Sequence, residues 1–101
     1  MASRLNLQLE LEQILGNRNV YYQPPESMKI GYPAIVYSRS DILDRFADDD
    51  KYLQKIAYRV IVIDKNPDSE IVDKISKMRF CKFQRHYVSD NLNHDVFTLY
   101  Y

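Results

Sequence analysis

The sequence predicts an α+β domain: one mostly antiparallel sheet of about five strands with two helices packed on it, in the order α-β-β-β-α-β-β. Two segments combine helix-forming residues with apolar residues at helical spacing. Five others are rich in β-branched and aromatic residues and are separated by turn-forming residues. The chain has 101 residues and only two glycines, so we expect a single domain spanning 1–101.

The first helix is predicted over SRLNLQLELEQILG, residues 3–16, although its pattern is ambiguous. As in a strand, polar residues alternate with Leu5, Leu7, Leu9 and Leu11. As on one helical face, apolar residues recur at Leu7, Leu11, Ile14 and Leu15. Leu, Gln and Glu are good helix formers. Ser3 is placed to cap the start, and Gly16 to form a left-handed cap at the end. These features favour the helix.

Two strands are expected next. NVYYQ, residues 19–23, is a short strand that Pro24 and Pro25 end, because proline cannot donate to a sheet ladder. AIVYSRS, residues 34–40, is a second strand with a largely apolar start. The polar, acidic stretch DILDRFADDDK that follows, residues 41–51, indicates a connection or a protruding loop.

The third strand is predicted over YLQKIAYRVIVID, residues 52–64. Its second half, 60–63, is apolar on both faces, which predicts a position in the middle of the sheet. The second helix is predicted over NPDSEIVDKISKM, with Asn66 as its cap and Pro67 in the first helical position. Its expected buried stripe consists of Ile71, Val72, Ile75 and Met78.

The last two strands, FCKFQRHYV and DVFTLYY, are predicted to form a hairpin through the turn-rich SDNLNH, residues 89–94. Within the final strand, the face with Phe97 is the more apolar and should pack on the helices. We expect this strand near a sheet edge, with Tyr100 and Tyr101 at its exposed end. A tyrosine ring and hydroxyl can both be used in an interface, so these two residues are candidate contacts with a neighbouring subunit.

Composition limits the possible functions. Lysine plus arginine and aspartate plus glutamate both number 14. The resulting zero net charge gives no support for nucleic-acid binding through general positive charge, and it favours association. The single cysteine indicates a reducing compartment. No signal peptide is apparent, and no apolar run approaches the roughly 20 residues that span a bilayer. Nine tyrosines without tryptophan suit protein interfaces.

No metal, catalytic or cofactor site is predicted. Cys81, His86, His94 and Asp95 do not have the spacing of a zinc site. In a regular strand, Cys81 and His86 should point to opposite faces. A Cys81 nucleophile would need an orienting third group and a glycine-rich oxyanion loop, so we interpret Cys81 as a small buried side chain. Our expectation is that the protein is not an enzyme.

Charged clusters have ordinary interpretations. Asp48, Asp49 and Asp50 lack the additional oxygens and the glycine of a calcium loop, which favours a solvated loop. The alternative is a functional electrostatic role for this loop. Basic residues alternate with aromatic ones at Arg79, Lys82, Arg85 and His86. With zero net charge, this pattern indicates a solvated sheet face or a protein contact rather than a nucleic-acid surface.

Three stretches, NVYYQPPESMKIGYPAIVYSRSD, YRVIVIDKNPDSEIVDKI and DNLNHDVFTLYY, resemble small proteins of the head–tail gene cluster of tailed bacteriophages that infect Gram-positive bacteria. The resemblance is to the tail-terminator or tail-completion group and covers nearly the whole chain. It implies helices against a sheet and a homo-hexameric ring that caps the tail tube. It also implies no enzyme activity and no cofactor.

The expected partners are other copies of this chain, the major tail tube protein and the head connector or stopper protein. Genomic DNA would pass through the lumen without specific binding, and no membrane is involved. The expected location is the virion tail and neck, after assembly in the host cytoplasm. Two alternatives remain open: a head-completion or connector protein of the neck, and a cytosolic regulator that binds nucleic acid. The family supplies no contact residues, so Asp48, Asp49, Asp50, Tyr100 and Tyr101 are interface candidates on physical grounds alone.

Overall fold

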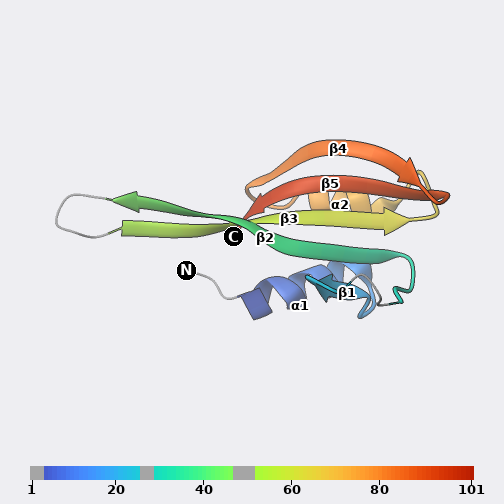
Figure 1. Cartoon of the computed structure of the whole chain (residues 1–101), viewed down its shortest axis with the longest axis horizontal. Helices are drawn as coiled ribbons and strands as arrows, with labels where there is room; N and C mark the ends of the chain where they lie inside the picture. The colour runs from blue at the N-terminus through green and yellow to red at the C-terminus, as the bar shows by residue number, and fades with distance from the viewer. Residues whose placement is uncertain (1–3, 26–28, 47–51) are drawn as a thin grey trace.

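The computed structural model describes residues 4–25, 29–46 and 52–101 and confirms the predicted α+β fold. In chain order the elements are α1 (Arg4–Leu15), β1 (Val20–Tyr22), β2 (Ala34–Phe46), β3 (Tyr52–Asp64), α2 (Glu70–Ser76), β4 (Cys81–Ser89) and β5 (Leu92–Tyr100). The strands form one sheet in the order β1-β2-β3-β5-β4 (Figure 1). Only β1 and β2 are parallel, and the other three pairs are antiparallel. As predicted, β3 lies at the centre.

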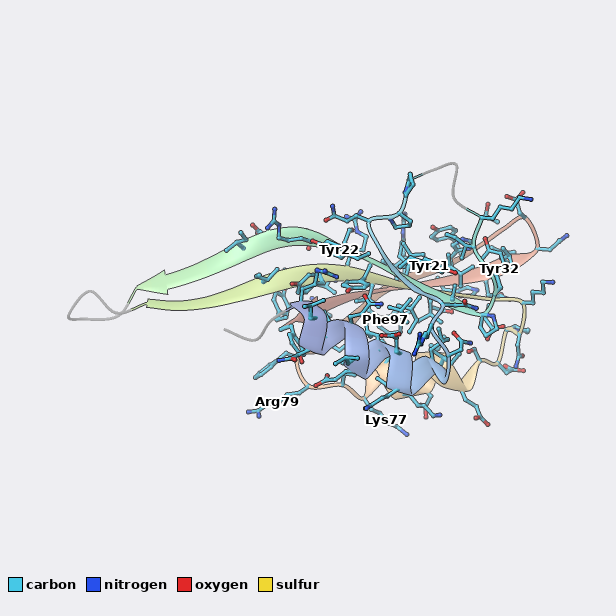
Figure 2. All side chains as sticks on the ribbon, turned by 90° about the horizontal axis from the view of Figure 1, so that it is seen from below. Tyr21, Tyr22, Tyr32, Lys77, Arg79 and Phe97 are labelled. Carbon is cyan, nitrogen blue, oxygen red and sulfur yellow. The ribbon has the colours of Figure 1, made fainter. Side chains whose placement is uncertain are left out.

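Both helices lie on one side of the sheet, and Phe97 points toward them from β5 (Figure 2). We call this side the covered face and the other side the open face. The sheet contributes to the core Val20, Ile35, Tyr37, Tyr58, Val60, Val62, Phe97 and Leu99. The helices contribute Leu7, Leu11, Leu15 and Ile75. Removing these apolar side chains from water is the main favourable contribution to folding.

Helix α1 ends as predicted. Gly16 has a φ of 83°, and its amide donates to the carbonyl of Glu12 at 2.9 Å. Glycine adopts this left-handed conformation without the steric cost that a side chain would add. The predicted cap at Ser3 lies outside the described residues.

Helix α2 begins later than predicted, and the Asn66–Pro67 start is wrong. The N-cap is Ser69, whose hydroxyl accepts a hydrogen bond at 3.3 Å from the backbone amide two residues on. The Asn66 side chain instead accepts from the amide of Asp68 at 3.0 Å. This local turn gives the asparagine a partner outside the helix.

The segment 41–51 is also different from the prediction of a connection. β2 continues to Phe46, and β3 begins at Tyr52, so only 47–51 separate the two strands. The aspartates in this segment disfavour a strand locally, but backbone pairing with β3 overrides that preference. Residues 42–46 and 52–55 form a two-stranded ribbon with no third strand among the described residues. We call this ribbon the arm, and it projects from the body in Figure 1.

The β4–β5 hairpin turns at Asp90 and Asn91, whose φ values are 52° and 63°. The connection is therefore shorter than the predicted 89–94, because both strands continue to this two-residue turn. β5 lies between β3 and β4, so it is next to an edge strand, as expected, and is not itself an edge. The edges of the sheet are β1 and β4. In the described parts of the chain, no helix has the length and apolar character needed to cross a membrane.

Candidate interaction surfaces

A β-bulge at Gln84 changes the face of the sheet on which the later side chains of β4, including His86, lie. Before the bulge Cys81 pairs with Leu99, and after it His86 pairs with Asp95. Leu99 and Asp95 lie on the same face of β5, because their positions differ by four and side chains alternate between faces. The prediction that Cys81 and His86 face opposite ways is therefore wrong, since one extra residue in a strand reverses the alternation.

These side chains nevertheless have structural partners. His86 Nδ1 lies 2.8 Å from a carboxylate oxygen of Asp95. The His94 ring stacks on Tyr87 with centroids 4.7 Å apart. Cys81 packs against the core, and burial raises the pKa of its thiol, which disfavours the reactive thiolate. Among the described residues, no group of three or more histidine, cysteine, aspartate or glutamate side chains could hold a metal ion.

The two final tyrosines have different environments. Tyr101 packs against the core, its amide donates to the carbonyl of Ile56 at 3.0 Å, and its hydroxyl donates to Glu10 at 3.1 Å. Desolvation, followed by the hydrogen bond to Glu10, raises the pKa of Tyr101. The amide of Tyr100 donates to the carbonyl of Phe80 at 3.1 Å. Tyr101 thus contributes to the domain's own packing, whereas Tyr100 lies on the open face.

A hollow of about 280 Å³ lies where the C-terminal strand meets α1. It is lined by Glu10, Met78, Arg79, Phe80, Tyr100 and Tyr101. The guanidinium of Arg79 lies 4.9 Å from the centroid of the Phe80 ring, and Arg79 projects outward in Figure 2. Half of Phe80 is exposed. The hollow therefore offers aromatic and charged groups together, which is common at protein contacts.

The outer face of α1 is a second apolar surface. Leu5 is 63% exposed and Leu9 is 60% exposed, while Leu7 and Leu11 are fully buried. Apolar residues thus occupy two sides of α1, which explains why its leucines alternate as in a strand. Leu9 also borders a shallow hollow of about 600 Å³ near the end of the helix. The described residues leave this outer side uncovered.

The open face combines an apolar row with a polar row. The strand registers align Tyr21, Val36, Ile61, Val96 and Arg85 in one row, and Ser38, Arg59, Thr98 and Lys82 in the next. At their centre is another hollow of about 280 Å³, lined by Arg59, Gln84, Arg85, Val96 and Thr98. We call it the arginine hollow. The side-chain amide of Gln84 donates to the Thr98 hydroxyl at 2.9 Å.

The two edge strands of the body of the sheet, β1 and β4, disfavour strand addition. β1 has only three residues. β4 carries the bulge at Gln84 and the cationic residues Lys82 and Arg85. Bulges and charged side chains on edge strands reduce pairing with other chains. Contacts made by side chains therefore fit these two strands better than β-augmentation.

The predicted acidic site, Asp48, Asp49 and Asp50, lies outside the described residues and stays a prediction. The strand ends that flank it, Phe46 and Tyr52, pair at the far end of the arm. Sequence reasoning did not identify Arg59 as part of a surface. Its signal was a cation within the otherwise apolar run IAYRVIVI, residues 56–63, which indicates a solvent-facing position.

Comparisons with protein-family models, with curated proteins and with solved structures find no match for this chain. The resemblance to phage neck proteins therefore depends on the three sequence stretches quoted above.

Proposed function

We propose that this protein is a structural component of a bacteriophage virion: a tail terminator that forms a homo-hexameric ring, caps the tail tube and joins it to the head connector. The single observation that carries this proposal beyond the resemblance is the amount of apolar surface left outside the core. Among the described residues, more than half of the side chain is exposed at Leu5, Leu9, Phe80, Phe83 and Val88. Contiguous exposed apolar surface is typical of interaction sites, and Leu5 and Leu9 are neighbours one turn apart on α1.

The arm supports the same proposal. A two-stranded ribbon is at best marginally stable in water without further packing. An arm without a third strand is therefore expected to contact another molecule. The arm and the exposed side chains of α1 and β4 are different surfaces. A head-to-tail ring requires one surface to meet a different surface of the next copy.

The remaining parts of the proposal follow from the resemblance and the composition. The ring assembles in the host cytoplasm and resides in the neck of the virion, where it contacts the major tail tube protein and the connector. DNA passes through its lumen without specific binding, and the zero net charge suits such passage. The function requires neither a cofactor nor a membrane, and no reaction is catalysed.

Deletion of the gene from the phage that encodes this chain tests the proposal. We expect tails of abnormal length that do not join to heads, as seen by electron microscopy, with rescue by the wild-type gene in trans. Tails of normal length joined to heads would show that the proposed function is wrong. Tails of normal length that fail to join would favour the head-completion alternative.

A further inference from the structure

The arginine hollow lacks an anionic partner in the part of the chain that the structure describes. Arg59 comes from β3 and Arg85 from β4, on either side of β5, and both side chains are exposed. Neither guanidinium forms an ion pair with another described residue. The guanidinium of Arg85 lies 5.1 Å from the ring centroid of Tyr87, which orients the cation without neutralising it. Two unpaired guanidinium groups at one hollow favour binding of carboxylate or phosphate oxygens.

The chain itself contains a matching anion. Its densest acidic run is Asp48–Asp50, in the connection between the two strands of the arm. Along β3, Arg59 is seven positions after Tyr52, which corresponds to about 23 Å at 3.3 Å per residue. The five-residue connection already joins the paired ends Phe46 and Tyr52. The acidic run therefore cannot reach the hollow of its own chain.

We propose that the acidic run Asp48–Asp50 of one copy docks into the arginine hollow, between Arg59 and Arg85, of a second copy of this chain. The proposal rests on the proposed ring and names one of its subunit contacts. In the sequence the run connects the two strands of the arm, and the hollow lies on the sheet, so the contact joins two different parts of the chain. Such a contact repeats from copy to copy and closes into a ring when the rotation allows. It also accounts for opposite charge clusters in a chain of zero net charge.

Charge reversal in the full-length chain tests the contact. We expect the double variant R59E/R85E and the triple variant D48K/D49K/D50K each to self-associate about tenfold or more weakly than wild type, by analytical ultracentrifugation at low salt. An equimolar mixture of the two should regain association. In that mixture, acidic runs meet arginine hollows, and lysine runs meet glutamate hollows. The matched control K29E/K65E makes the same change in net charge at exposed residues elsewhere and should associate like wild type.

Wild-type association by R59E/R85E, or a mixture as weak as its components, would overturn the proposal. If R59E/R85E associated normally but lost binding to a DNA duplex at low salt, the hollow would be a phosphate site instead. That result would also overturn the proposal.

Disulfide crosslinking gives a second readout, in a C81A background that removes the native thiol. The D49C/Q84C variant retains both arginines and should form a ladder of covalent multimers on oxidation. The control D49C/K77C carries its second thiol on the helix side and should form no such ladder. If gene deletion disrupts tails as expected but D49C/Q84C forms no ladder, only the docking contact is wrong. Normal joined tails in the deletion phage would instead overturn the proposed function.

Discussion

The two faces of the sheet are built from the same strands but differ in what they contact. On the covered face, Val60 pairs with Tyr37 on one side and Phe97 on the other, and all three side chains are almost fully buried. On the open face, the neighbouring residue Arg59 pairs with Ser38 and Thr98. One face of β3 therefore contributes to the core, while the other carries the exposed Arg59 among apolar residues.

This difference separates stability from recognition. The covered face buries apolar area, so substitutions there should change the free energy of unfolding. The open face and the arm bury less within one chain, so substitutions there should mainly change association.

The largest effect is expected from a matched pair of isosteric substitutions. Val60→Thr places a hydroxyl in the apolar core and should lower the free energy of unfolding by about 1–3 kcal/mol. Val36→Thr makes the same change on the half-buried open face and should cost less than about 0.5 kcal/mol, as is usual for surface changes. Chemical denaturation of both variants measures the difference. Equal losses would mean that the open face is as tightly packed as the covered face.

A smaller effect is expected at the start of α2, which holds Ile75 against the covered face. Ser69→Ala removes the N-cap and should cost about 1 kcal/mol. Asn66→Ala removes only the hydrogen bond of an exposed turn and should cost less. Thermal unfolding of the two variants gives the order of the two effects. A greater loss for Asn66→Ala would place the start of the helix at the earlier residue.

The smallest effect is expected from tyrosine ionisation, which lowers the free energy of unfolding only at alkaline pH. Desolvation by burial raises the pKa of both Tyr37 and Tyr58, which lie on the covered face. The folded protein therefore retains these protons when the unfolded chain begins to lose them near pH 10. The contribution of these two tyrosines to stability is therefore constant below that pH and should be lost as the pH rises above it.

Unfolding curves between pH 8 and pH 11.5, by urea titration, would measure this loss. Tyr58→Phe should make the alkaline decline shallower, because phenylalanine has no proton to lose. An unchanged slope would mean that Tyr58 does not titrate differently in the folded and unfolded states.

Most of the fold could be predicted because local composition and long-range packing agree. β3 has its apolar run where the sheet requires a central strand. The prediction failed where local patterns compete. Both Asn66 and Ser69 are good N-caps, and only the observed turn at Asn66 decides between them. The extension of β2 through Asp41–Phe46 depends on pairing with a strand that follows it in the sequence, which local propensity does not reveal.

The candidate surfaces were less predictable. Strand alternation alone could not place His86, because the bulge at Gln84 has no clear local signature. The exposed leucines of α1 did have a signal, since Leu5 and Leu9 interrupt a single helical stripe. The alternating leucines suggest either a helix or a strand, and the structure shows that they belong to a helix with two apolar sides.

The central claim is that this chain forms a ring between the tail tube and the head of a phage. Electron cryo-microscopy of the neck of a phage that carries this gene tests it most directly. We expect six copies in a closed ring above the tail tube, with the arm of each copy reaching the open face of the next. A neck in which no density fits this chain, or in which it occupies a position away from the end of the tail tube, would contradict the account.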